Sequence, residues 1–163
     1  MRINKNFLQK DYFKKLQREI CGPSFPWYHL DYLVSEPKDE ISNFYHLIYQ
    51  YSKPNSEYFK LLEPLIEALN PIALIRIRIN FYIKSDKVFE TNFHTDVSNS
   101  KENYRTAILY LNTNNGFTKF KNKKVKSEEN TLVDFEGHTL HSAVSATDDK
   151  KILININYYE SSK

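Results

Sequence analysis

Residues 75–83 read Ile75-Arg76-Ile77-Arg78-Ile79-Asn80-Phe81-Tyr82-Ile83, and apolar and polar side chains alternate along the stretch. An alternation with a period of two predicts a β-strand, because successive side chains of a strand point to opposite faces. One face carries isoleucine and phenylalanine, and the other carries arginine, asparagine and tyrosine. Residues 151–159 repeat this design, with isoleucines on one face and the following polar residues on the other: Lys151, Asn155 and Asn157.

The rest of the chain divides at about Pro71. Before it, apolar side chains recur every three or four residues, which predicts helices over 3–20, 39–51 and 57–70. Pro64 lies inside the third segment, which could therefore form two short helices. After Pro71 the period is two, and we expect further strands at 88–97, 105–112, 116–121, 131–136 and 141–146, with a hairpin turn at 114–116.

These elements predict a mainly β protein with N-terminal α-helices, built as a β-sandwich or jelly roll. We expect one domain over residues 1–163, with helical support in 1–70 and the jelly-roll core in 71–163. The isoleucine faces would then meet the helices, and the polar faces would point into the sandwich, where a polar lining indicates a binding pocket. The alternative that the polar faces are simply solvated is equally open on the pattern alone.

Composition excludes several classes of protein. The three glycines, Gly22, Gly116 and Gly137, are too scattered for a phosphate-binding glycine loop. A single cysteine, Cys21, permits no internal disulfide and favours the cytoplasm. A net charge of +3 gives no strong signal for nucleic acid, and the five lysines of residues 119–126 favour a solvated hairpin. No apolar run is long enough to span a membrane, and the first residues lack a signal-peptide pattern.

The residues with the clearest chemistry are two histidines and an aspartate. His94-Thr95-Asp96 ends an expected strand, where residues i and i+2 project to the same side and can reach one ion. His141 begins another expected strand. Two histidines and one carboxylate form the facial triad that holds non-haem Fe(II) and leaves coordination positions open.

Other histidines compete for this role. His29-Leu30-Asp31 has the same spacing as His94-Thr95-Asp96, but it lies in an expected loop. His46 falls in an expected helix, and for both histidines an ordinary polar or packing role is the better interpretation. His138 competes with His141 for the third ligand position, and we favour His141 because His138 has the opposite strand parity and follows the turn at Glu136-Gly137.

The surroundings of the triad suit a dicarboxylate cosubstrate. A 2-oxoglutarate molecule would chelate the iron through its C1 carboxylate and keto oxygen, and its far carboxylate would need a cation. Lys151, ten residues after His141, suits that role, and Tyr110 and Tyr82 could donate hydrogen bonds to the same molecule. The alternative is a surface lysine and two packing tyrosines.

Several stretches together carry a family resemblance. The chain resembles the Fe(II)/2-oxoglutarate-dependent dioxygenases of the prolyl-4-hydroxylase-like branch, and particularly the short forms carried by bacteriophage and marine bacterial genomes. The similar stretches span most of the chain in the expected order: Phe25-Pro26-Trp27-Tyr28, residues 78–82, Phe93-His94-Thr95-Asp96, residues 106–118, residues 133–137, His141 and residues 147–159.

The resemblance implies a double-stranded β-helix, which is a cupin-like jelly roll, with helices packed on its major sheet. It implies that His94, Asp96 and His141 hold iron and that Lys151 binds the distal carboxylate. Many relatives have arginine in place of this lysine, and Lys150 is the alternative. Tyr110 and Tyr82 would assist in binding the cosubstrate.

The implied reaction consumes O2, converts 2-oxoglutarate to succinate and CO2, and hydroxylates a C–H bond of a small molecule, peptide or protein. Family analogy favours a prolyl or other amino-acid side chain as the target. The candidate substrate-binding residues come from the polar strand faces: Arg76, Arg78, Asn80 and Asn157. The competing hypothesis is a non-catalytic jelly-roll binding domain with a vestigial or structural metal site.

Overall fold

The computed structural model describes residues 1–31, 43–97 and 102–160, and within them the chain forms two helices and two antiparallel sheets. The elements follow in this order: β1 (Arg2–Asn4), α1 (Lys10–Ile20), β2 (Tyr28–Leu30), β3 (Asn43–Gln50), β4 (Lys53–Pro54), α2 (Phe59–Leu69), β5 (Ala73–Tyr82), β6 (Arg105–Tyr110), β7 (Phe117–Phe120), β8 (Lys123–Lys126), β9 (Leu132–Glu136), β10 (His141–Val144) and β11 (Lys151–Tyr159).

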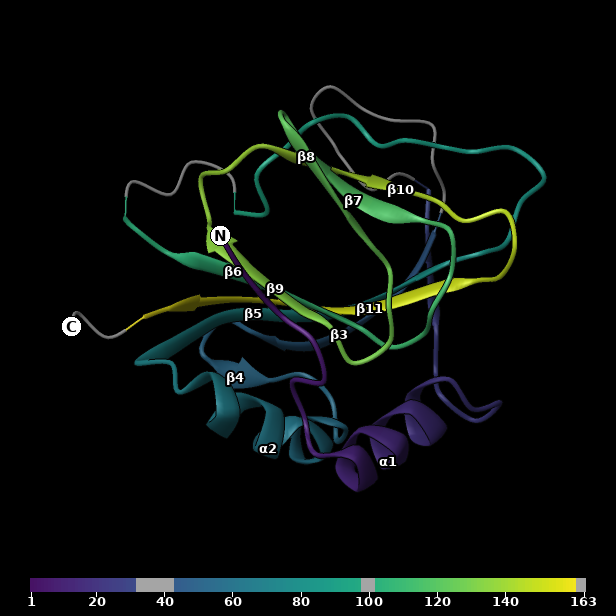
Figure 1. Ribbon diagram of the computed structural model, residues 1–163. Helices are drawn as coiled ribbons and strands as arrows, with labels where there is room; N and C mark the ends of the chain where they lie inside the picture. The colour runs from purple at the N-terminus through teal and green to yellow at the C-terminus, as the bar shows by residue number, and fades with distance from the viewer. Residues whose placement is uncertain (32–42, 98–101, 161–163) are drawn as a thin grey trace.

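The two sheets form a sandwich that the helices cover on one side (Figure 1). The larger sheet has the strand order β1-β9-β6-β11-β5-β3-β2, and β4 pairs with β3 beside this path. The smaller sheet has the order β10-β7-β8 and lies over one face of the larger sheet, whereas α1 and α2 lie against the opposite face. The strands β5 and β11 are therefore at the centre of a three-layered arrangement.

The apolar face of β5 and β11 packs against the helices. Four isoleucines of these strands are fully buried, and they share one core cluster with helix side chains such as Leu16 and Leu65: Ile77, Ile79, Ile154 and Ile156. Each buried side chain of this size stabilises the fold by roughly 1.5–3 kcal/mol relative to its exposed state. The sequence pattern of residues 75–83 thus predicts the helix-covered face correctly.

The polar face of the same strands points between the two sheets. Lys151 and Asn157 have no exposed surface, and Asn80 is 2% exposed. The register pairs Lys151 with Tyr82 and Asn155 with Arg78, so these polar side chains form rows across β11 and β5. The alternative interpretation, in which the polar faces are solvated, is wrong.

The expected helix over 39–51 is also wrong. Residues 39–42 lie outside the described residues, and residues 43–50 form the strand β3, which pairs with β5. The segment is rich in aromatic and branched side chains, which fit a pleated sheet better than a helix surface. His46 is consequently a strand residue, and the described part of the first 70 residues contains four strands besides the two helices.

The two helices differ from the sequence expectation, α1 in where it begins and α2 in its continuity. Helix α1 begins at Lys10 and not at residue 3, and Arg2–Asn4 instead pair with β9 as strand β1. Helix α2 is a single helix with Pro64 inside it. None of the helices in the described part of the chain is long and apolar enough to cross a membrane.

The expected strand over 88–97 is reduced to two isolated bridges, Glu90 with Val144 and His94 with His141. Side-chain oxygens replace some of the backbone acceptors of a regular strand pair here. Ser145 Oγ accepts the Phe89 N–H at 2.8 Å, and Thr91 Oγ1 accepts the Ala143 N–H at 2.9 Å.

The expected hairpin turn at 114–116 is a connection between sheets, because β6 belongs to the larger sheet and β7 to the smaller one. In contrast, the lysine-rich stretch does form a hairpin, from β7 and β8.

Candidate metal centre

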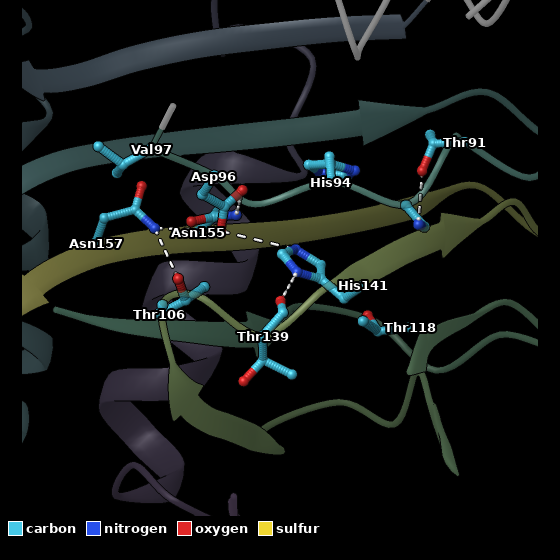
Figure 2. A network of polar contacts seen from close by, with 12 residues as sticks. Thr91, His94, Asp96, Val97, Thr106, Thr118, Thr139, His141, Asn155 and Asn157 are labelled. Carbon is cyan, nitrogen blue, oxygen red and sulfur yellow. Dashed lines mark hydrogen bonds and ion pairs between the residues drawn. The ribbon is translucent and has the colours of Figure 1, made fainter. Parts of the chain in front are cut away.

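Three side chains with metal-ligating atoms meet where the 88–97 segment contacts β10. The backbone of His94 exchanges two hydrogen bonds with that of His141, at 3.0 and 3.1 Å, and this bridge sets the two side chains next to each other. Asp96 follows two residues after His94. One ligand atom from each of His94, Asp96 and His141 lies within 4.8 Å of the other two, and Figure 2 shows the three side chains together.

Each histidine ring is held by a backbone carbonyl. His94 Nδ1 lies 2.8 Å from the Asn92 carbonyl, and His141 Nδ1 lies 3.0 Å from the Thr139 carbonyl (Figure 2). A carbonyl oxygen only accepts hydrogen bonds, so both Nδ1 atoms donate, and in the neutral form of each ring Nε2 carries the lone pair. This tautomer and this kind of support are typical of histidines that bind a metal through Nε2.

Asp96 is held as a carboxylate. Its side chain is 4% exposed, and burial alone would raise its pKa. The neighbouring His141, Arg76 and His94 and the hydrogen bond from Asn155 outweigh burial, and they hold the pKa of Asp96 well below its usual range. Asn155 and Asn157 donate to its two oxygens at 3.1 and 3.2 Å.

Burial and the adjacent His141 lower the pKa of His94, which disfavours the protonated form that cannot bind a metal. Two imidazoles and one carboxylate on the same side of a narrow site are the donor set that first-row divalent metals such as Fe(II) accept, with open positions for other ligands. The residues present therefore fit a non-haem iron ion.

A narrow cavity, here called the inner cavity, lies beside this cluster between the two sheets. Besides the three ligand residues, its walls include Arg78, Asn80, Tyr82, Thr118 and Asn155. The space between the wall atoms is about 330 Å³. Only about 20 Å³ of it is wide enough to hold the centre of a water molecule. A larger ligand therefore enters only when side chains of the wall move aside.

A second, wider cavity, here called the outer cavity, meets the site from the other side of Asp96. It spans about 930 Å³, part of which is open to solvent, and its walls include Tyr51, Arg76, Val97 and Tyr159. Asp96 belongs to the walls of both cavities, so the outer cavity lies next to one of the three metal-ligating side chains.

Lys151 is a buried cation at the start of β11. Its Nζ donates to the carbonyls of Phe117 and Val144 at 2.8 and 2.9 Å and lies 5.3 Å from the centre of the Tyr82 ring. Burial lowers the pKa of Lys151 to about 7. Gly116 contacts its aliphatic stem so closely that an added Cβ would lie 3.2 Å from Cδ, so the lysine is confined to this position.

Tyr110 lies behind the inner cavity. Its side chain is fully buried, and its hydroxyl donates to Thr118 Oγ1 at 2.7 Å. Thr118 in turn belongs to the cavity wall. Tyr110 is among the residues expected from the sequence, and Thr118 is not. The signal for Thr118 is its position two residues after Gly116, near the start of β7.

The remaining histidines have other partners. His29 lies 3.5 Å from Asp31 in an exposed pair, and His46 contacts the Pro26 carbonyl at 2.7 Å and Ser56 Oγ at 2.8 Å. His138 is exposed, and its Nε2 lies 3.0 Å from the Glu102 carbonyl. The structure thus brings His141, and not His138, next to His94.

The polar residues of β5 and β11 occupy different positions around Asp96. Arg76 lies 3.6 Å from the carboxylate and donates to the Asp96 carbonyl at 2.9 Å. Asn157 accepts a hydrogen bond from Arg76. It donates to Asp96 and Thr106, and Figure 2 shows these residues around it. Arg78 and Asn80 line the inner cavity. Sequence reasoning missed Asn155 as a contact of Asp96, although its alternation with Asn157 places both on one face.

Comparisons with known proteins agree with this picture at the level of the fold. No protein-family model and no curated protein sequence matches the chain. Solved structures do match its architecture, and they include prolyl hydroxylases and other 2OG-Fe(II) oxygenases. The protein therefore has the fold of the 2OG-Fe(II) oxygenases.

Three solved structures illustrate the likeness. A prolyl hydroxylase from Trichoplax adhaerens, in complex with a hypoxia inducible factor peptide, has a TM-score of 0.69 at 16% identity, over 99% of this chain and 87% of that chain. A prolyl-4-hydroxylase from Pseudomonas putida has a TM-score of 0.64 at 16% identity, over 98% and 92%. The epimerase SnoN, in complex with Fe3+, alpha ketoglutarate and nogalamycin RO, has a TM-score of 0.68 at 11% identity, over 97% and 78%.

Proposed function

We propose that this protein is an Fe(II)/2-oxoglutarate-dependent dioxygenase. It would convert 2-oxoglutarate and O2 to succinate and CO2 while it hydroxylates a C–H bond of a second substrate, with one atom of O2 entering succinate and the other entering the hydroxylated substrate. The observation that carries the proposal is the cluster of His94, Asp96 and His141, which opens onto a cavity between the sheets. In this reading the two sheets are the major and minor sheets of a double-stranded β-helix, with α1 and α2 packed on the major sheet.

His94, Asp96 and His141 hold the metal, and the bonds from Asn155 and Asn157 orient the carboxylate. Fe(II), when bound, would supply the redox chemistry that activates O2. The protein contributes ligation and orientation, and the narrow cavity excludes water and other competing reactants.

Lys151 binds the far carboxylate of 2-oxoglutarate. Its ammonium group uses two of its three N–H bonds on backbone carbonyls and keeps the third for an anion. Lys151 lies four residues before Asn155 on β11, so about 13 Å of strand separates it from the residue that contacts Asp96. A dicarboxylate chelated at the metal would extend along this strand toward the lysine, beside Tyr82 and the Tyr110–Thr118 pair.

Lys150 is a poorer candidate for this role. Its charge lowers the pKa of Cys21, against the dominant effect of burial, which raises it. Cys21 caps α1 on the helix-covered side of the larger sheet. The side chain of Lys150 therefore acts on the opposite face from Lys151.

The target of hydroxylation is proposed to be an amino-acid side chain, with proline as the first to test, because two of the similar structures are prolyl hydroxylases. The single cysteine supports a reducing compartment, and the cytoplasm is the proposed location.

An anaerobic binding experiment tests the proposal. Adding Fe(II) and 2-oxoglutarate to the protein should produce the weak visible charge-transfer band of the chelated cosubstrate and raise the melting temperature. Asp96→Ala should lack the band and should lose more than about 100-fold of succinate formation in air. Asp31→Ala, in the other His-x-Asp sequence, is the matched control and should retain both. Succinate formation near the wild-type level in Asp96→Ala would overturn the assignment, and absence of the band together with no thermal stabilisation would favour a non-catalytic binding domain.

A further inference from the structure

Arg78 is a half-buried cation in the wall of the inner cavity, and it has no hydrogen-bonding or charged partner among the described residues. Its Nε is buried and makes no hydrogen bond, and no hydrogen bond or ion pair joins its guanidinium to any residue in the described ranges. The contact with the Tyr45 ring, 5.8 Å from the guanidinium carbon to the ring centre, leaves that N–H unsatisfied. An unpaired buried charge destabilises a fold, so a cation in this state is expected to have a ligand.

The positive charge of Arg78 is not balanced by the charged groups around the metal site. Among the residues described in the inner cavity wall, Asp96 is the only carboxylate, and it already contacts Arg76, Asn155 and Asn157. With the proposed ligands bound, Asp96 and the two carboxylates of 2-oxoglutarate balance the divalent metal and Lys151, which leaves the charges of Arg76 and Arg78. Arg76 is hydrogen-bonded to the Asp96 carbonyl and to Asn157. Arg78 then still lacks an anion.

Two amide oxygens in the same wall also lack partners. Oδ1 of Asn80 and Oδ1 of Asn155 are buried and accept no hydrogen bond. Asn155 lies directly opposite Arg78 across the β5–β11 pair, and Asn80 follows two residues later on the same face of β5. An unsatisfied donor, Arg78 Nε, therefore lies beside two unsatisfied acceptors. A ligand with a carboxylate next to an ammonium or N–H group would satisfy both, because the carboxylate accepts from the arginine and the N–H donates to the amide oxygens.

We propose that Arg78 binds a carboxylate of the substrate that is hydroxylated, and that Asn80 and Asn155 accept hydrogen bonds from an N–H or ammonium group of the same molecule. This inference rests on the proposed function and adds the chemical class of its substrate. The carboxylate belongs to the substrate because the cosubstrate uses one carboxylate on the metal and the other on Lys151. Burial, with Arg76 as a further cause, lowers the pKa of Arg78, which a bound anion would reverse.

Two sources can supply such a carboxylate, a free amino acid or an acidic side chain of a peptide. Free L-amino acids, including L-proline, form the first arm of the test, and their primary amides are the neutral matched compounds. Peptides with blocked ends form the second arm, with and without one Asp or Glu. The readout is succinate formation above the rate without a second substrate.

We expect a carboxylate compound from one arm to raise succinate formation at least about tenfold in the wild-type protein, and its neutral counterpart to lose most of that effect. Arg78→Met should abolish the difference between the two. The result that would overturn the inference is a response to neutral compounds alone, or no response to any carboxylate while the charge-transfer band forms. A missing band in the wild-type protein instead overturns the proposed function.

A second measurement, the melting temperature, uses the protein without metal, cosubstrate or substrate. Arg78→Met removes a buried unpaired charge, so the metal-free variant should melt about 2–4 °C higher than the wild-type protein. Arg18→Met, at a side chain that is 74% exposed, is the control and should leave the melting temperature unchanged. A fall of several degrees in Arg78→Met would show that the arginine has a structural role and would contradict the inference.

Discussion

The two faces of β5 and β11 share one backbone and have opposite chemistry. On the helix side, the isoleucines are fully buried among apolar neighbours. On the other side, the same strands bury Lys151, asparagines and the Nε of Arg78, and several of their polar atoms have no partner in the described part of the chain. One face therefore stabilises the fold, and the other costs stability that a ligand would restore. Unpaired polar groups on only one of two equally buried faces mark that face as a binding site.

The largest expected effect is on the apolar face. Ile154→Ala removes a fully buried side chain from the centre of the core and should lower the free energy of unfolding by about 4 kcal/mol. Urea unfolding measures this loss, and Ile83→Ala, at a side chain that is 55% exposed, should cost less than about 0.5 kcal/mol. The folded fraction of Ile154→Ala should bind Fe(II) as the wild-type protein does. Equal losses in the two variants would contradict the role of this face.

The opposite face should respond in the opposite direction. Lys151→Met removes a buried charge and should stabilise the ligand-free protein, because burial lowers the pKa of the lysine to about 7 and so disfavours its charged form. The affinity for 2-oxoglutarate should fall about 100-fold with the loss of a buried charged hydrogen-bond donor. Titration of the charge-transfer band and urea unfolding measure the two effects. Lys150→Met is the matched control, and a larger loss of cosubstrate affinity there would reassign the anion site.

The same lysine gives opposite dependences on pH. Between pH 7 and 10.5 the unfolded chain binds the proton at Lys151 and the folded chain does not, so the stability of the ligand-free protein should rise with pH in this window. Binding of the 2-oxoglutarate carboxylate needs the protonated lysine, so affinity should fall roughly 15-fold between pH 7 and about pH 8.5. Lys151→Met should lose both slopes. An affinity that stays level over this range would show that the lysine does not bind the cosubstrate.

Much of the sandwich could be predicted from the sequence, because its central strands are patterned on both faces. The alternation in residues 75–83 and 151–159 predicts two strands and the side on which the helices pack. The failures occur where pairing depends on partners distant in sequence. Strand β3 reads as a helix because its apolar spacing is ambiguous until β5 lies beside it, and β1 forms only because β9 presents a free edge.

The candidate site could be predicted as a set of residues but not as a network. The His-x-Asp spacing and His141 are visible in the sequence, and the structure brings them within ligand distance. The carbonyls of Asn92 and Thr139 that orient the histidines cannot be seen in a sequence, because backbone groups carry no residue signal. The unpaired state of Arg78 is equally invisible, since it depends on which acids fold nearby.

The smallest expected effect comes from residues of the polar face that orient Asp96 but do not bind the metal. Asn157→Ala removes a hydrogen bond to Asp96 without removing a proposed ligand, and it should weaken Fe(II) binding about tenfold. Thr106→Val removes only the oxygen that accepts a 3.0 Å bond from Asn157, and it should have a smaller effect in the same direction. Competition with a coloured chelator measures both. If Thr106→Val weakened binding as much as Asn157→Ala, the network and not the contact with Asp96 would set the affinity. Unchanged binding in both variants would instead mean that Asn155 alone is enough to orient the carboxylate.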